Sequence, residues 1–341
     1  MRCSRCQKRL LAGAPCPLHP DVERVAAAPA PPLPRDLPEG LVAVAALGAG
    51  GMGQVFAVRD RHGDRFALKL SQSDLGGEAA ALKALGAPHT PQLYASGRWR
   101  EGSWLLMEEL HGQTLAQREA AGPVEPAEAL AFVRRAAELL HVVHARGLSH
   151  RDVKPENLWL RTSGEVALLD FGLAGSHVAD RAGTAHYMAP EQCIDASSAG
   201  PAADLYALGA VLFELVTGEP VFTGSAAELR DAHVRRVARP LSECGVRWPS
   251  LEPVLARLLA KEPAQRPSDA GQLLAELAAV SATDAAVAVA AAHRPKSAQA
   301  RRAALLGVRT TEGLKVLLDV VRREGGLLAS AEERRFVFAF P

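Results

Sequence analysis

Two kinds of periodicity divide the central part of the chain. Residues 55–58 are β-branched and aromatic, and residues 65–70 alternate so that Lys69 lies on the less apolar face of a predicted strand. Residues 126–145 instead carry an apolar stripe at helical spacing, which predicts a helix. Between about residues 41 and 280, the pattern therefore predicts a strand-rich first half and a helical second half.

Composition excludes several classes of protein. The 341 residues are 48% hydrophobic and 23% charged with a net charge of +1, so a mostly disordered chain is excluded and no overall attraction to nucleic acid is expected. Basic residues interrupt the start of the chain, so no secretory signal is predicted. Residues 277–292 are Ala-rich, include Asp284 and are too short for a membrane span. Five cysteines without an export signal favour a reducing cytoplasm.

The two ends of the chain differ from its centre. Residues 1–20 contain two close pairs of thiolate and imidazole ligands, which favour a small structural zinc ribbon or knuckle over chance: Cys3, Cys6, Cys16 and His19. Residues 21–40 form a Pro/Ala-rich linker. Residues 282–341 form an Ala-rich linker and a basic tail with a predicted helix at 311–324 and alternating aromatic residues at 336–340. Both ends are candidates for docking other proteins.

A glycine-rich segment precedes the predicted strands. Residues 48–53 fit G-x-G-x-x-G, a pattern that chance can produce in a chain with 29 glycines. A dinucleotide-binding fold needs a helix after the last glycine, whereas residues 55–58 predict a strand. The order favours a glycine-rich hairpin laid over nucleotide phosphates, where backbone N–H groups can approach closely.

Lys69 needs a partner if its strand is buried. Glu78, Leu82 and Leu85 share one face of a predicted helix, so Glu78 is a candidate for that partner. The alternative is that Glu78 only complements the dipole of the first helical turn.

A second polar cluster follows the predicted helix. Residues 158–161 and 165–169 predict a hairpin, and Asn157 and Asp170 stand just beyond its open ends. Two oxygen ligands are thus offered to one hard cation such as Mg²⁺. Asp152 precedes Asn157 and is a candidate to accept a hydroxyl proton, and Lys154 can neutralise charge on a phosphoryl group. The alternative to a catalytic cluster is a polar loop without a catalytic role beside a hairpin of the core.

Taken in order, these motifs resemble the eukaryotic-like (Hanks-type) serine/threonine protein kinases in their compact bacterial form. The matching motifs are the glycine-rich loop at 48–55, the lysine Lys69, the helix glutamate Glu78, the HRDxKxxN segment at 150–157, the DFG segment at 170–172 and the APE segment at 189–191. Later landmarks also fit: Asp204 in the large lobe, and Arg266 as the partner of Glu191.

The resemblance implies an α+β, bilobal fold. It comprises a small β-rich lobe at 41–107, a hinge at 108–110 and a larger helical lobe at 111–281. It also implies ATP with Mg²⁺, Mn²⁺ being a possible substitute, and protein substrates with Ser/Thr acceptors. The residues that would contact ATP are Leu47, Gly48, Ala49, Gly50, Gly51, Met52, Gly53, Val55, Ala67, Lys69, Glu78, Glu108 and Leu110.

The same resemblance assigns roles to the polar cluster. Asp152 would orient and deprotonate the acceptor hydroxyl, Lys154 would stabilise the transferring phosphoryl group, and Asn157 with Asp170 would hold Mg²⁺. A pseudokinase or scaffold that binds ATP without efficient transfer is the alternative, and a small-molecule phosphotransferase is a third interpretation.

Three residues depart from the family pattern or bear on regulation. Met107 is expected as the gatekeeper before the hinge. Trp159 replaces a smaller aliphatic residue under the adenine, so the indole either narrows the pocket or turns aside. Ser176 is the candidate for autophosphorylation in the short segment after residue 170, unless activity depends only weakly on loop phosphorylation.

Overall fold

A computed structural model describes most of the central region of the chain. The described residues are Cys3, Leu10, Cys16, 31–34, 37–38, 40–50, 53–100, 102–171 and 184–281. The chain divides into two units, residues 1–289 and 290–341, and every described residue belongs to the first. The predicted helix at 311–324 and the aromatic alternation at 336–340 lie outside the described residues.

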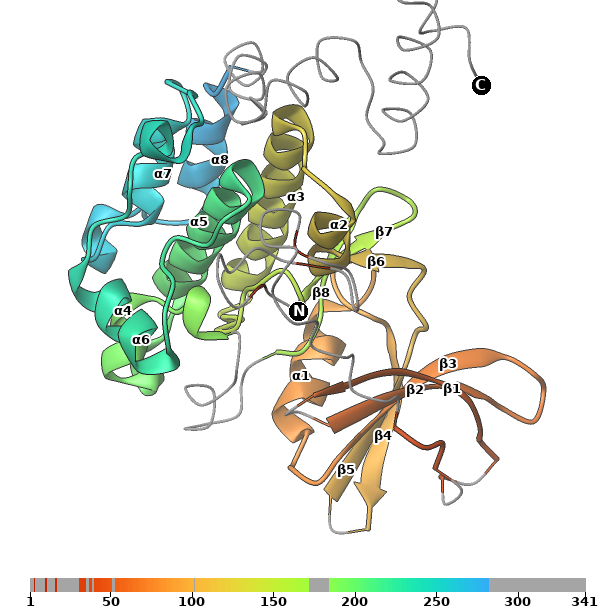
Figure 1. Ribbon diagram of the computed structural model, residues 1–341. Helices are drawn as coiled ribbons and strands as arrows, with labels where there is room; N and C mark the ends of the chain where they lie inside the picture. Colours follow the sequence, from red (N-terminus) through yellow and green to blue (C-terminus); the bar gives the residue numbers. More distant parts are fainter. Residues whose placement is uncertain are drawn as a thin grey trace, which may run out of the picture. The chain divides into compact units, whose positions relative to one another are not determined.

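The first half forms an antiparallel five-stranded sheet with the order β1-β2-β3-β5-β4 (Figure 1). Its strands are β1 (Val42–Gly50), β2 (Gly53–Arg59), β3 (Arg65–Ser71), β4 (Leu93–Trp99) and β5 (Gly102–Met107). The predicted alternation is confirmed, because Leu68 and Leu70 pack with Phe56 and Val58 on one face of the sheet. Lys69 lies on the other face, where it pairs across the strands with Val55.

One helix covers this second face. Helix α1 (Gly76–Leu85) buries Leu82 against Leu105 and Met107 of β5. Glu78 is buried on the same helical face at 6% exposure, as the spacing with Leu82 predicted. Helix α1 therefore places the carboxylate of Glu78 on its buried face.

The second half is helical. Its helices are α2 (Leu115–Ala121), α3 (Pro126–Ala145), α4 (Pro190–Ile194), α5 (Pro201–Thr217), α6 (Ala226–Arg235), α7 (Glu252–Leu258) and α8 (Ala270–Ala278). Short 3₁₀ turns lie at η2 (Thr184–His186), η3 (Ala196–Ser198), η4 (Leu241–Cys244) and η5 (Pro263–Gln265). A second sheet, ordered β6-β7-β8, is made of β6 (Gly112–Thr114), β7 (Leu158–Arg161) and β8 (Val166–Leu168).

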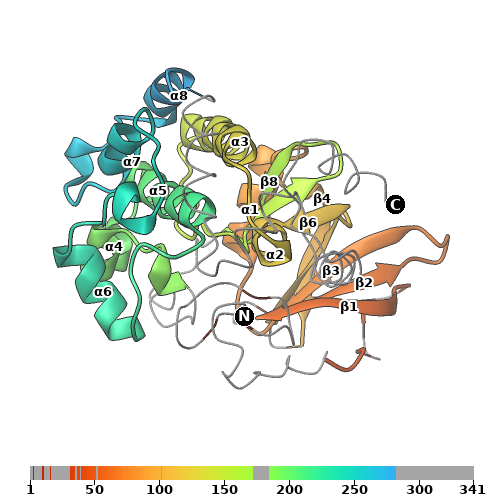
Figure 2. The same ribbon diagram turned by 45° about the horizontal axis from the view of Figure 1, so that its top comes forward.

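Helix α5 is the centre of the large lobe. Nearly all of its side chains are buried, and it contacts α3 and α7, between which it lies in both views (Figure 1 and Figure 2). Helix α3 occupies the range that its apolar stripe predicted, and Gly147 follows its end in the left-handed region at φ +72°. In the described part of the chain, no helix has the length and apolar character needed to cross a bilayer.

A buried histidine lies between α5 and α6. The ring of His233 is 0% exposed, and its Nδ1 lies 2.8 Å from the hydroxyl of Tyr206. Burial, and next the charge of Lys261, lower the pKa of His233 to about 3. The imidazole is therefore neutral in the folded protein at any pH at which the protein would be handled.

This neutral imidazole predicts a stability that falls on acidification. Below about pH 6.5 this histidine is protonated in the unfolded chain but not in the folded chain. The free energy of unfolding therefore falls by up to about 1.4 kcal/mol for each pH unit. Replacing His233 with Gln should flatten the dependence of the unfolding free energy on pH between about 6.5 and 5 by up to that slope. Urea unfolding at a series of pH values measures it, with the exposed His62→Gln as control. Equal slopes in wild type and His233→Gln would contradict the assignment.

Candidate active site

The glycine-rich segment forms a hairpin, as predicted. β1 and β2 pair antiparallel, with Gly48 opposite Val55 and Gly50 opposite Gly53. Gly53 has φ +125°, and a Cβ there would lie 2.1 Å from the carbonyl oxygen of Leu70, so only glycine fits. Leu47 lies within β1 and is half exposed, and Gly51 with Met52 at the tip lies outside the described residues.

Lys69 connects the two lobes of the site. Its side chain is 1% exposed, and its Nζ lies 2.8 Å from each carboxylate oxygen of Glu78. Nζ also donates to Oδ1 of Asp170 at 2.7 Å, a contact between residues far apart in the sequence. Burial alone would lower the pKa of Lys69, but the charges of Asp170 and then Glu78 outweigh it and raise that pKa. Lys69 is therefore a fixed cation, and the burial of Glu78 is explained by an ion pair rather than by the helix dipole alone.

The predicted β7–β8 hairpin brings Asn157 and Asp170 together. The backbone N–H of Leu169 donates to the carbonyl oxygen of Asn157 at 2.9 Å, so Asp170 follows directly. Asp170 adopts the left-handed region at φ +53°, a conformation that non-glycine residues rarely take. Surrounding protein atoms oppose its ionisation, but Lys69 overcomes this and lowers the pKa of Asp170. The carboxylate is ionised at neutral pH, and 38% of the side chain stays exposed.

Asn157 is oriented by Asp152. Its Nδ2 donates to the backbone oxygen of Asp152 at 2.9 Å and to Oδ2 of the same residue at 3.0 Å. Because both donor contacts use the amide nitrogen, the amide oxygen Oδ1 is directed away from Asp152. Asn157 thus offers a neutral oxygen, and Asp170 an anionic one, which is the donor chemistry that Mg²⁺ prefers.

Asp152 stands beside a lysine. Lys154 Nζ lies 2.7 Å from Asp152 Oδ2, and the side chain of Asp152 is only 2% exposed. The two residues before Asp152 are bound by a side chain of α5. Asp204 accepts hydrogen bonds from the backbone N–H of His150 at 2.8 Å and from that of Arg151 at 2.7 Å. The predicted large-lobe aspartate therefore fixes the loop that carries Asp152 and Lys154.

The segment after β8 is only partly described. The ring of Phe171 is buried and lies 4.9 Å from that of His150, centroid to centroid. His150 Nε2 in turn lies 2.8 Å from the carbonyl oxygen of Leu169. The third residue of the motif, Gly172, and the candidate phosphorylation site Ser176 lie outside the described residues.

Two ion pairs that the sequence analysis missed hold the hinge. The guanidinium of Arg161 in β7 donates to Oε1 and Oε2 of Glu108 at 2.6 Å and 3.0 Å. This hydrogen bonding outweighs the effect of partial burial and lowers the pKa of Glu108. Glu109 receives Arg65 of β3 in the same bidentate way, at 2.7 Å and 2.6 Å. The hinge therefore has one carboxylate tied to each lobe. The hinge residue Leu110 is half buried.

Val55 and Ala67, two of the residues expected to contact ATP, share one face of the small-lobe sheet. Ala67 of β3 pairs with Ala57 of β2, which lies two residues after Val55 on the same face. On its other side, Ala67 pairs with Met107 at the end of β5. Trp159 stands on the β7 face that also carries Arg161, and its indole Nε1 donates to the carbonyl oxygen of His111 at 3.4 Å. The indole is thus directed toward the chain just after the hinge, and whether it narrows the pocket or turns aside stays a prediction.

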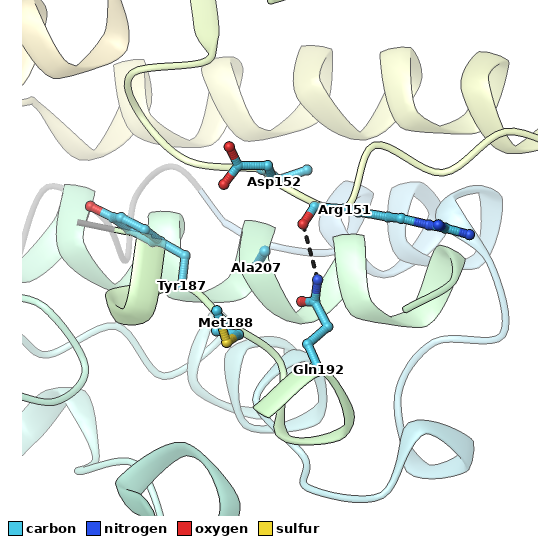
Figure 3. Close-up of a pocket in the computed structure, with 7 residues that line it drawn as sticks. Arg151, Asp152, Tyr187, Met188, Gln192 and Ala207 are labelled. Atoms are coloured by element: carbon cyan, nitrogen blue, oxygen red, sulfur yellow. Dashed lines mark hydrogen bonds between the residues drawn. The ribbon is translucent and has the colours of Figure 1, made fainter. Parts of the chain in front are cut away.

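A small pocket lies next to Asp152 in the large lobe (Figure 3). It is lined by Arg151, Asp152, Val153, Tyr187, Met188, Gln192 and Ala207. The neighbouring APE segment is anchored by the predicted ion pair, in which Arg266 donates to Glu191 at 2.7 Å and 2.8 Å. Arg266 is 2% exposed, so the pair is a buried structural contact beneath this surface.

Comparison with known families agrees with this geometry. The pattern of the protein kinase domain matches residues 41–278, which is more than half of the chain. The chain belongs to the protein kinase family. The fold prediction is confirmed at this level: a β-sheet small lobe and a helical large lobe.

Individual relatives are bacterial serine/threonine-protein kinases. The chain is 33% identical over 257 residues to PknE of Mycobacterium tuberculosis, covering 70% of this chain and 45% of PknE. It is 36% identical over 249 residues to PknD of the same species, covering 67% and 37%. It is 34% identical over 262 residues to PknB of Mycolicibacterium smegmatis, covering 68% and 41%. The chain thus spans less than half the length of these relatives.

A solved structure supports the same conclusion about the fold. The crystal structure of the PknI kinase domain of Mycobacterium tuberculosis superposes with a TM-score of 0.54 at 26% identity. The match covers 74% of this chain and 98% of that domain.

Proposed function

We propose that this chain is a serine/threonine protein kinase that transfers the γ-phosphate of ATP to Ser/Thr hydroxyls of proteins. The observation that carries the proposal is one connected network of contacts. Lys69 contacts Asp170, the hairpin joins Asp170 to Asn157, and Asn157 contacts Asp152. The names of the relatives, all serine/threonine-protein kinases, support the acceptor class.

The ATP site is assigned to the side of this network that faces the small lobe. The glycine-rich hairpin at 48–53 covers the phosphates, and Lys69, oriented by Glu78, binds them as a fixed cation. Adenine lies between Val55 and Ala67 above and the hinge at 108–110, where backbone groups of Glu108 and Leu110 hydrogen-bond to it. The lobes are accordingly assigned to residues 41–107 and 111–281.

Mg²⁺ is assigned to Asn157 and Asp170. The two side chains fit the ion, because one supplies an amide oxygen and the other a carboxylate that Lys69 keeps ionised. When bound, the metal supplies charge neutralisation for the phosphate oxygens.

Asp152 is assigned as the base and Lys154 as its cationic neighbour. Asp152 orients the acceptor hydroxyl and takes its proton at Oδ1 or Oδ2 while the hydroxyl oxygen bonds to the γ-phosphorus. The bond between that phosphorus and the β,γ-bridging oxygen breaks in the same step, and ADP leaves. Lys154, 2.7 Å from Oδ2, neutralises negative charge on the phosphoryl group in transit. Catalysis in this arrangement comes from positioning and electrostatics.

The test is the chemical identity of the phosphorylated product. The full chain is incubated with γ-labelled ATP, Mg²⁺ and generic protein acceptors, and the labelled residues are separated after acid hydrolysis. Label on phosphoserine and phosphothreonine is the expected result. ATP binding without label would indicate the pseudokinase, and label only on small molecules in a mixed acceptor pool would indicate a small-molecule phosphotransferase.

We also propose a structural zinc site in residues 1–20, from the ligand spacing alone. Cys3 and Cys16 are buried, while Cys6 and His19 lie outside the described residues. Among the residues the structure describes, no group of three metal-ligating side chains occurs. Replacing Cys3 and Cys6 with Ser should abolish stoichiometric zinc in the purified chain, measured by metal analysis, with Cys244→Ser as control. Zinc content unchanged from wild type would end this proposal.

Three further expectations from the sequence stay predictions. They are autophosphorylation at Ser176, a cytoplasmic location, and docking of other proteins by residues 1–40 and 282–341. Undiminished activity of Ser176→Ala would remove the first and leave weak dependence on loop phosphorylation.

A further inference from the structure

Gln192 bridges two segments of the large lobe. Its Nε2 donates to the carbonyl oxygen of Arg151 at 2.9 Å (Figure 3). Its Oε1 accepts from the backbone N–H of Ala189 at 3.1 Å. The side chain is 8% exposed and lines the pocket beside Asp152. One amide group thus joins the APE segment to the loop that carries the proposed base.

The acceptor of this contact belongs to the peptide bond that enters Asp152. Arg151 takes the left-handed region at φ +64°, a conformation that costs a β-carbon-bearing residue energy unless its surroundings impose it. Asp204 fixes the peptide before Arg151 through the Arg151 N–H at 2.7 Å. Gln192 fixes the peptide after it, through the carbonyl oxygen. The two contacts together fix the orientation of both peptide planes around Arg151. The plane between Arg151 and Asp152 in turn determines the direction of the Asp152 side chain.

We propose that Gln192 is a positioning residue for phosphoryl transfer, acting through the Arg151–Asp152 peptide group. The inference rests on the proposed function, since it assigns Asp152 as the base. Because the APE segment is itself anchored by the buried pair of Glu191 and Arg266, Gln192 ties the base to a rigid platform. It touches no reacting atom.

Only an amide of this length satisfies both contacts. Glutamate keeps the acceptor for the Ala189 N–H but places a second oxygen against the Arg151 carbonyl, where a donor is required. Methionine has a similar volume and provides neither contact. The chain also offers a matched control, because Gln272 Oε1 accepts from the backbone N–H of Ser268 at 2.6 Å in the same manner at the start of α8.

The experiment compares Q192E, Q192M and Q272M in the full chain. Steady-state kinetics with varied ATP should show kcat reduced about tenfold or more in both Gln192 variants, with KM for ATP within about twofold of wild type. Q272M should stay within about twofold of wild type in both constants. Thermal unfolding of each variant identifies losses that come from unfolding; should Q192E be unfolded, the comparison of Q192M with Q272M decides.

A second readout separates positioning from simple capping of α4. A carboxylate at position 192 would be buried and would face the carbonyl oxygen of Arg151, and both raise its pKa above the ordinary value. Protonation then gives the Q192E side chain an O–H donor, so the ratio of its kcat to that of wild type should recover as the pH falls from about 8 to about 6. Wild-type kcat in Q192E would overturn the inference, because only the Ala189 contact would then matter, and so would a pH-independent ratio. Absence of transfer in wild type would instead overturn the proposed function, and this inference with it.

Discussion

Replacing Asp152 with Asn should reduce the rate of protein phosphorylation about 1,000-fold while leaving ATP affinity within about twofold of wild type. The substitution keeps the size of the side chain and removes the group that accepts the hydroxyl proton. ATP binding should survive because the phosphate-facing cation, Lys69, contacts Asp170 and Glu78 rather than Asp152. The loss is therefore expected in kcat.

The measurement pairs initial rates with equilibrium binding of a fluorescent ATP analogue. Asp231→Asn is the matched control, because Asp231 is exposed on α6, where it pairs with Arg235 of the next turn. A kcat for Asp152→Asn within about tenfold of wild type would contradict the role of this carboxylate as the base.

Replacing Lys69 with Met should have two effects of different origin. Transfer should fall by about two orders of magnitude or more, because the cation that binds the phosphates is lost. The folded state should lose about 3–5 kcal/mol, because the buried carboxylate of Glu78 loses the charge that pairs with it. The two effects are separable because only the second depends on Glu78.

A double variant provides that separation. Adding Glu78→Gln to Lys69→Met removes the buried carboxylate charge that has lost its lysine and should restore most of the unfolding free energy, measured by urea denaturation at pH 7. Activity should remain at the level of Lys69→Met. Equal stability of Lys69→Met and wild type would show that the ion pair contributes nothing to folding. Recovery of activity in the double variant would show that Lys69 does not bind the phosphates.

Much of the fold could be predicted because its signals are local. The alternation around Lys69 and the stripe along residues 126–145 each reflect one element packing on one face, and β3 and α3 follow them closely. The glycine hairpin was predictable for the same reason, since a strand follows the last glycine. In the site, Asn157 and Asp170 could be brought together because a single hairpin joins them.

Contacts between distant ordinary residues could not be predicted. Arg161 and Arg65 are two of many arginines, and nothing in their local sequence indicates that they hold the hinge carboxylates. Gln192 follows the APE motif, but its partner is the backbone of Arg151, which has no sequence signature. Such contacts depend on how the lobe folds over tens of residues, so only the structure provides them.

The proposed function requires one site that holds the phosphates of ATP between Lys69, Asp152 and a metal bound by Asn157 and Asp170. The most direct measurement is a crystal structure of the full chain with a non-hydrolysable ATP analogue and Mg²⁺. We predict Mg²⁺ coordinated by Oδ1 of Asn157 and the carboxylate of Asp170, with Lys69 on the α- and β-phosphates and Asp152 facing the γ-phosphate. A nucleotide bound elsewhere, or a metal that contacts neither Asn157 nor Asp170, would contradict this assignment of the site.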